Sequence, residues 1–511
     1  MPADNRQSSP GREQEEPVLK RLASSGAANT GAALLGSVAN FLLIVLVTRF
    51  WSTSDAGVLF AATSFFNIVL ALAHLGSDQG MVRFIAWNSA HSGSGGSRLI
   101  IKVGMLPALA MAIFVMVICL VFGSPLSSML GADDVTDGQA LVWVLVAFLP
   151  VAVLYEQFLA VCRGFAVMRP TIVVERALRP ILQVLLILAI GISGGGIMLL
   201  AVAWAIPYAV CLILAGAALL KVLKENPDHL SSPSTEHVAV VRDFWKFTAP
   251  RGLARLAQVM IQRSDVIVVT MLLGPAPAAV YTAATRFLVL GQVATSALQQ
   301  VSEPQLAKLL SASRMKAVVV VTRQMTLWSI VFVWPVYLLF AVHAATFLEW
   351  VFGAEYGQGA PVLRVLCFAM LLATAIGPMD VLLLMAGRSS LSLMNVTIAL
   401  ILDLLLCLYL IPMYGIMGAG IAWAVAIIAK NVLCVWQVRR HLGVGLSIGA
   451  LKMWLLSLVG IFGVAGSLAY LLPGQPWVSV GFSVLTGIFY LLFLWRKRSL
   501  LMYSGDPTLG G

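Results

Sequence analysis

Residues 196–205 read GIMLLAVAWA and residues 415–424 read GIMGAGIAWA, so six of ten positions are identical at an offset of 219 residues. A second pair lies earlier in each half. TRFWSTSDAGVLFAAT at 48–63 aligns with TMLLGPAPAAVYTAAT at 270–285, at an offset of 222. Two matches at nearly equal offsets predict that one structural unit occurs twice. Chance similarity between Ala- and Leu-rich helices is the alternative.

The composition is that of a membrane protein. The chain has 511 residues, of which 60% are hydrophobic and 11% are charged, and its mean hydropathy is +0.94. An average soluble domain carries about 25% charged residues, so we expect this chain to be solvated by lipid. The net charge of +11 does not indicate nucleic acid as a partner, because most basic residues lie in short connectors between apolar runs.

Fourteen apolar stretches are long enough to cross a bilayer, which takes about 20 residues. They are 28–50, 55–77, 99–123, 139–163, 169–193, 195–221, 245–272, 276–302, 324–346, 358–385, 389–412, 414–438, 449–472 and 477–496.

The predicted fold is therefore all-α and polytopic, with two parallel six-helix lobes around a central cavity and a C-terminal helix pair. The predicted organisation is a disordered cytoplasmic tail (1–27), an N-lobe (28–221), a cytoplasmic linker (222–244), a C-lobe (245–438), helices 13 and 14 (439–496) and a cytoplasmic tail (497–511). With the N-terminus inside, the outer connectors carry almost no Lys or Arg besides Arg49 and Arg364. This asymmetry predicts that both termini are cytoplasmic. Parallel repeats of this kind place a substrate site between the lobes and work by alternating access.

Several charges fall at membrane depth, where a charged side chain usually faces a cavity or a partner. One sector of the seventh stretch is polar, which predicts a stripe of the helix that faces water. This sector holds Arg251, Arg255, Gln258, Gln262, Arg263 and Asp265. An excess of arginine would suit a diphosphate, which the planar guanidinium group binds bidentately. The candidate substrate-binding residues are Arg176, Arg179, Arg251, Arg255, Arg263, Arg286 and Asn40. Structural ion pairs between helices are the alternative for each arginine.

Acidic residues at depth are candidates for coupling transport to an ion: Glu156, Asp265, Asp380 and Asp403. No cofactor or metal is expected. The six cysteines form no C-x-x-C pair, the histidines are scattered, and no G-x-x-x-x-G-K-[ST] phosphate loop occurs. The DDVTD stretch at 133–137 could hold magnesium against a prenyl diphosphate, but we interpret it as a solvated loop.

Four stretches resemble bacterial polysaccharide flippases of the multidrug/oligosaccharidyl-lipid/polysaccharide exporter superfamily. They are GAALLGSVANFLLIVLVTRFWSTSDAGVLF (31–60), RSDVIVVTMLLGPAPAAVYTAATRF (263–287), FGAEYGQGAPVLRVL (352–366) and GRSSLSLMNVTIALILDLLLCLYLIPMYGIMGAGIAWAVA (387–426). The resemblance covers nearly the whole chain.

The resemblance implies a transporter of the bacterial plasma (inner) membrane and not an enzyme. It would move an undecaprenyl-diphosphate-linked oligosaccharide, a precursor of lipopolysaccharide O-antigen or another cell-surface polysaccharide, from the inner to the outer leaflet. Membrane lipids, a polysaccharide polymerase and glycosyltransferases are the implied partners. The alternatives are a multidrug or cation antiporter, a peptidoglycan-precursor flippase and a polytopic glycosyltransferase.

Overall fold

The computed structural model describes residues 31–32, 34–90, 96–227, 237–445, 458, 463 and 476–496. Within these residues every regular element is a helix, and nine helices are long and apolar enough to cross a membrane. The prediction of an all-α polytopic protein is confirmed. The count of fourteen spans and the side of each terminus stay predictions. The predicted span 449–472 and the two tails lie outside the described residues apart from single positions.

The part of the chain predicted to be the N-lobe holds a first helix, Leu34–Phe50, and ten further elements. These are α2 (Thr53–His74), α3 (Ser77–Ala90), α4 (Ser97–Val121), α5 (Gly123–Met129), η1 (Ala132–Asp134), α6 (Gly138–Ala147), α7 (Leu149–Gly164), the π-helical η2 (Thr171–Leu178), α8 (Arg179–Ile192) and α9 (Ile197–Glu225).

The C-lobe and the C-terminal region hold the remaining elements. These are α10 (His237–Leu273), α11 (Pro275–Ser311), α12 (Met315–Val342), α13 (Ala344–Phe352), η4 (Ala354–Gly359), α14 (Ala360–Ile376), α15 (Met379–Met385), α16 (Ser389–Tyr414), α17 (Ile416–Leu442) and α19 (Pro476–Arg496). The predicted span 358–385 is divided between α14 and α15, because Gly377 has a left-handed φ of 86° and Pro378 follows it.

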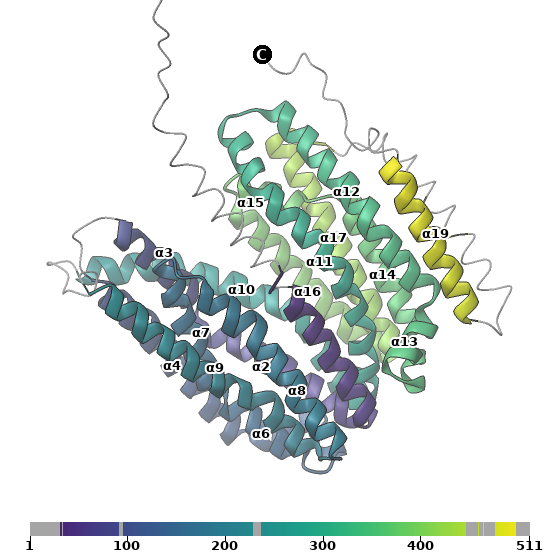
Figure 1. Ribbon diagram of the computed structural model, residues 1–511, viewed down its shortest axis with the longest axis horizontal. Helices are drawn as coiled ribbons and strands as arrows, with labels where there is room; N and C mark the ends of the chain where they lie inside the picture. The colour runs from purple at the N-terminus through teal and green to yellow at the C-terminus, as the bar shows by residue number, and fades with distance from the viewer. Residues whose placement is uncertain are drawn as a thin grey trace, which may run out of the picture.

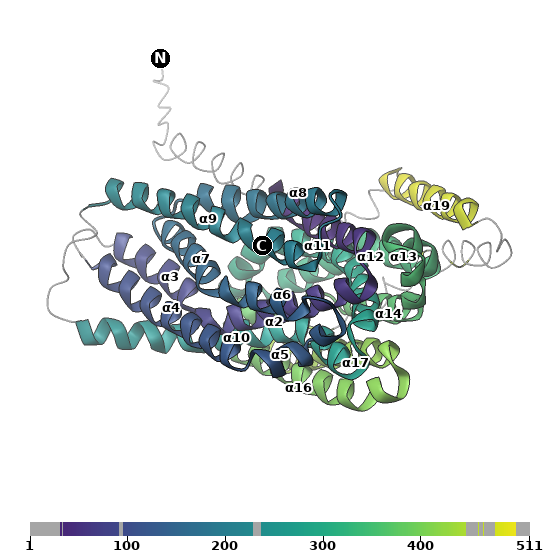
Figure 2. The same ribbon diagram turned by 90° about the horizontal axis from the view of Figure 1, so that it is seen from below.

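The two lobes lie side by side in Figure 1, converging at one end and diverging toward the other. Figure 2, turned by 90°, places α8 and α9 at one face and α16 and α17 at the opposite face. The C-terminal α19 lies at the edge of the C-lobe, where Trp477 packs against Trp350 of α13 with ring centroids 5.3 Å apart.

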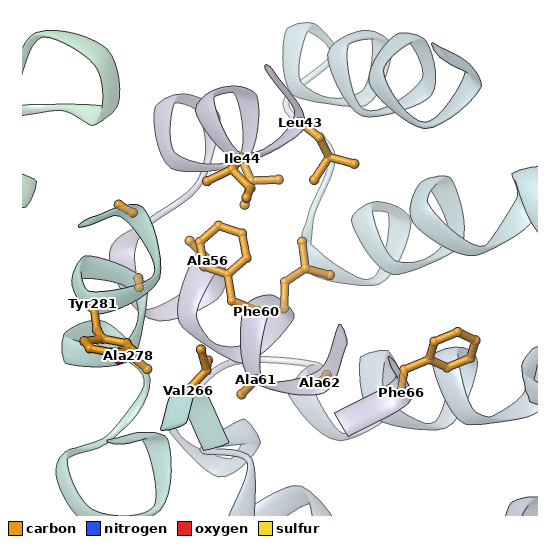
Figure 3. Packing of buried hydrophobic residues seen from close by; sticks show 14 of the residues in the cluster. Leu43, Ile44, Ala56, Phe60, Ala61, Ala62, Phe66, Val266, Ala278 and Tyr281 are labelled. Carbon is orange, nitrogen blue, oxygen red and sulfur yellow. The ribbon is translucent and has the colours of Figure 1, made fainter. Parts of the chain in front are cut away.

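One buried core joins the lobes. Figure 3 labels, among others, five members of this cluster, all less than 8% exposed: Leu43 and Ile44 of the first helix, Phe60 of α2, Val266 of α10 and Tyr281 of α11. The helix α2 is therefore buried between the lobes along much of its length, because it has apolar residues on every side rather than on one stripe.

At the converging end, α2 meets the start of α11 backbone to backbone. A Cβ atom added at Gly57 would lie 1.8 Å from the carbonyl oxygen of Pro275. Nearby, Arg49 of the first helix donates a hydrogen bond from Nε to the carbonyl of Val351 at 2.9 Å. We call this the proline end. The contact requires glycine at position 57.

We predict that Gly57→Ala pushes the lobes apart at the proline end. Carbon and oxygen atoms need more than about 3 Å between them, so α2 and α11 must separate by at least about 1.2 Å. Spin labels at Thr53→Cys and Ala276→Cys measure that separation. The matched control is Gly216→Ala in α9, whose added Cβ would meet Phe158 at an ordinary 3.6 Å. An unchanged distance in Gly57→Ala would contradict the contact.

The long helix α10 belongs to both lobes. Its first half packs on the N-lobe, where Phe244 joins a buried cluster with Met81 of α3, and Gly252 lies against the backbone of Leu75 and Gly76. Its second half packs on the C-lobe, where Ala257 and Ile261 join a buried cluster with Ala399 and Leu400 of α16. We call the end of the molecule at which α3 meets α10 the arginine end.

Candidate functional site

A cavity of about 430 Å³ lies between the lobes. Its walls come from the first helix, α2, α8 and α9 of the N-lobe and from α10 and α11 of the C-lobe, with one residue each from α14 and α17. The charged and amide residues that line it are Asn40, Asn67, Arg179, Gln183, Gln262, Arg263, Asp265, Arg286 and Gln292. Four of the seven predicted substrate-binding residues are thus brought together here.

Three guanidinium groups face this cavity without a carboxylate partner. Arg179 donates from Nη1 to the hydroxyl of Tyr208 at 3.2 Å, and its Cζ lies 5.2 Å from the centre of that ring. Among the described residues, the Nε atoms of Arg179 and Arg286 are buried without a hydrogen-bond partner. Within the same part of the chain, Arg179, Arg263 and Arg286 form no ion pair.

The carboxylate that lines the cavity is Asp265, which is 3% exposed. One of its oxygens accepts a hydrogen bond from the hydroxyl of Tyr281 at 2.6 Å, and the other accepts from the backbone N–H of Val266 at 2.8 Å. Asp265 is thus held by neutral donors rather than by an arginine. The lining carries three positive charges and one negative charge, so the cavity is electropositive.

The rest of the lining combines amides with aromatic rings. The Nδ2 of Asn40 donates to the carbonyl of Gly36 at 2.9 Å, and the Nε2 of Gln183 donates to the carbonyl of Trp204 at 2.9 Å, so both amide oxygens remain as acceptors. Trp204 and Tyr208 pack with ring centroids 5.2 Å apart, and Trp423 lines the opposite wall. Such a lining suits a polar guest with hydroxyl groups and apolar faces.

The position of Arg179 follows from the local sequence. Pro180 has no N–H and would clash with the carbonyl four residues before it in a regular α-helix. The preceding residues instead form η2, in which the N–H of Arg179 bonds to the carbonyl of Val174, five residues back. Short π-helical stretches bend helices and are frequent at functional sites. Arg176 lies within η2, half-buried, and is not among the cavity-lining residues.

Arg255 lies outside the cavity, in a charged network near the arginine end. Its Nη1 is 2.9 Å from Asp78 and its Nη2 is 3.7 Å from Glu156. Glu156 in turn lies 2.9 Å from Nε2 of His74. This network ties α10 to α2, α3 and α7. Arg255 therefore forms ion pairs between helices, which is the alternative that the sequence left open for each arginine.

The remaining predicted residues are spread over the molecule. Arg251 is exposed and donates to Gln79 at 3.4 Å. Asp380 accepts a hydrogen bond from Ser392 at 2.6 Å and lies 3.6 Å from Lys430. Asp403 is fully buried in α16, and its Oδ2 has no hydrogen-bond partner among the described residues.

Sequence reasoning missed several residues that the fold brings to these sites. Asp78, the partner of Arg255, lies just after a predicted span and carried no signal beyond its charge. Tyr208 and Tyr281, which contact Arg179 and Asp265, were hidden in apolar runs. Pairs 29 and 16 residues apart in sequence are not visible as helical i,i+4 neighbours.

This arrangement of two helical lobes, spanning helices and a polar, electropositive cavity between the lobes is that of a membrane transporter. A model of the family described as "Polysaccharide biosynthesis protein" matches residues 22–310. The chain belongs to this family. Among curated protein sequences, none matches the chain.

Solved structures share the fold. A structure described as lipid II flippase MurJ in an inward closed conformation superposes with a TM-score of 0.73 at 12% identity, covering 92% of this chain and 99% of that one. An inward-facing multidrug resistance MATE transporter of the MOP superfamily gives a TM-score of 0.65 at 17% identity, covering 80% and 94%. A MOP superfamily transporter from Pyrococcus furiosus gives 0.53 at 16%, covering 82% and 95%. The fold is therefore the one that flippases and exporters of this superfamily share.

Proposed function

We propose that the protein flips an undecaprenyl-diphosphate-linked oligosaccharide from the cytoplasmic to the outer leaflet of the bacterial plasma membrane. The observation that carries this proposal is the set of three arginines, Arg179, Arg263 and Arg286, that share one cavity and form no ion pair with a carboxylate among the described residues. Burying unpaired charges is costly, so a site of this kind is best explained by an anionic guest that completes the charge balance. A diphosphate carries the charge and the bidentate geometry that arginine binds.

The neutral part of the cavity would hold the sugars. Asn40, Asn67 and Gln292 offer donors and acceptors to hydroxyl groups, and Trp204 and Trp423 offer flat apolar faces. The polyprenyl tail would stay in the bilayer, because the lipid acyl chains already solvate a long hydrocarbon chain. The family assignment to polysaccharide biosynthesis supports a sugar-bearing substrate.

The cycle we propose is alternating access. The arginine end faces the cytoplasm, the headgroup enters between the diverging lobes, the three arginines gather the diphosphate, and rocking of the lobes releases the headgroup at the proline end. Asp265, which lines the cavity, and Asp403, whose Oδ2 is unpartnered among the described residues, are the better-placed candidates for ion coupling. Glu156 and Asp380 are occupied by His74 and Lys430. Glycosyltransferases would act before this step, and a polymerase would act after it.

The direct test is translocation in proteoliposomes that contain a short sugar linked to undecaprenyl diphosphate. The headgroup is expected to become accessible to a membrane-impermeant hydrolase at a rate that depends on the protein. Peptidoglycan-precursor lipid and a cationic dye, assayed in parallel, test the alternative flippase and the drug antiporter. Translocation of the dye without the sugar lipid would overturn the proposal.

A further inference from the structure

A second electropositive hollow, of about 390 Å³, lies at the arginine end, outside the central cavity. It is formed by α3, the end of α7 and the first half of α10. Three arginines line it, namely Arg83, Arg163 and Arg251, and the acid in its wall is Asp78, which is bonded to Arg255 at 2.9 Å. The lining therefore has surplus positive charge of its own.

Two of these arginines converge on one aromatic ring. The Cζ atoms of Arg83 and Arg251 lie 4.0 Å and 4.4 Å from the centre of the Phe247 ring. Neither guanidinium group forms an ion pair among the described residues, and Arg251 has Gln79 as a neutral partner. Cation–π contacts fix the planes of both groups while leaving their N–H donors available. Both arginines line the same hollow, so their positive charges together favour an anion there.

Arg163 completes the hollow from α7. Its Nη1 atom lies 3.3 Å from a carboxylate oxygen of Glu175 and donates to the hydroxyl of Thr171, also at 3.3 Å. The hollow has room for a diphosphate group with several waters, since a water molecule occupies about 30 Å³ in the liquid. Guanidinium groups that line a small pocket can each bind phosphate oxygens through two N–H donors.

A polar stripe connects this hollow to the central cavity. Arg251, Arg255, Gln258 and Gln262 follow one another at i+4, i+3 and i+4, so they share one face of α10. Arg251 lines the hollow, and Gln262 lines the cavity. All four are exposed or half-buried. The distance along the helix axis is about 16 Å, a short path between two sites that favour the same charge.

We propose that this hollow is a second phosphate-binding site, at which the diphosphate headgroup docks before it moves along α10 into the central cavity. The binding chemistry stands by itself, and only the identity of the phosphate source rests on the proposed function. The other source of the same chemistry is an anionic phospholipid of the surrounding bilayer.

Binding can be measured locally with a fluorophore in the hollow. The native cysteines Cys119, Cys162, Cys211, Cys367, Cys407 and Cys434 are all buried, so an introduced thiol is labelled selectively. Val82→Cys places the label in the lining, and Ala86→Cys, exposed and one turn further along α3, serves if Val82→Cys does not fold. In phosphatidylcholine nanodiscs, inorganic pyrophosphate should change the fluorescence saturably. Arg83→Gln with Arg251→Gln should weaken the apparent affinity at least about tenfold, since two charge-assisted contacts are lost.

The matched control is Arg98→Gln, which removes an exposed arginine of α4 that does not line the hollow. Its pyrophosphate affinity should equal that of the parent. The site would be overturned if the double variant bound pyrophosphate as tightly as the parent protein. It would also be overturned if Arg98→Gln weakened pyrophosphate binding as much as the double variant does.

The source is distinguished by competition. A few mole per cent of undecaprenyl diphosphate in the nanodisc should displace pyrophosphate, whereas phosphatidylglycerol at the same level should not. Displacement by phosphatidylglycerol alone would make this a phospholipid site and overturn the docking role.

Transport then separates this inference from the proposed function. The double variant should need about tenfold more substrate lipid for half-maximal translocation, with little change in the maximal rate, as expected for a docking site. If the wild-type protein binds pyrophosphate at the hollow but moves no sugar lipid, the proposed function falls and the site stands. If the wild type is active and the double variant needs the same amount of substrate lipid for half-maximal translocation, the docking role is overturned and the proposed function is retained.

Discussion

Arg286→Gln is expected to lower headgroup translocation by about 100-fold or more and, at the same time, to make the protein more stable. Arg286 is enclosed in the central cavity, its Nε has no hydrogen-bond partner among the described residues, and it forms no ion pair there. Removing a buried charge that lacks a partner relieves a desolvation cost. Removing one of three contacts to a diphosphate loses a charge-assisted pair in a buried site, which costs several kcal/mol of binding.

In Arg286→Gln, translocation is expected to fall while thermal stability rises. Translocation is measured in proteoliposomes, and stability is measured as the midpoint of thermal unfolding in detergent. Arg263→Gln should behave in the same way, because Arg263 lines the same cavity and also forms no ion pair within the part of the chain that the structure describes. Arg98→Gln should change neither quantity. A fall in stability together with activity would mean that Arg286 serves the fold and not the guest.

Arg255→Gln is expected to destabilise the protein by about 2 kcal/mol or more. The change leaves the carboxylate of Asp78 without an ionic partner, at 7% side-chain exposure, and its Oδ1 already has no hydrogen bond among the described residues. Breaking a buried pair costs about 3–5 kcal/mol, and the 37% exposure of the Arg255 side chain reduces that figure.

A second mutation, at Asp78, tests whether the orphaned carboxylate causes the loss of stability. Asp78→Asn in the Arg255→Gln background removes the orphaned charge, so most of the lost stability should return. Unfolding by denaturant, with the double variant compared against both single variants, measures the coupling. If Arg255→Gln lost transport with unchanged stability, Arg255 would belong to the substrate path and not to the network that holds α10.

The sequence predicted the all-α, polytopic character of the fold because hydrophobic length is a local property. It also predicted that Arg179, Arg263, Arg286 and Asn40 lie at depth, and the structure places these four around one cavity. It could not separate them from Arg255, because the partner of Arg255 lies 177 residues away. No helical period reports a contact of that range. The same limit explains why Arg83 and Phe247, which meet across α3 and α10, were not recognised as part of a site.

The division of α10 between the lobes bears on how the protein can move. A helix anchored to one body through Phe244 and Gly252 and to another through Ala257 and Ile261 cannot travel rigidly with both. When the bodies rotate, the backbone between residues 252 and 257 must flex, or one anchorage must slide. Two blocks pivoting on each other therefore give an incomplete description of the molecule. The smallest adequate description has three parts: the two lobes and the helix α10 that links them, with Arg255 in the segment between its two anchorages.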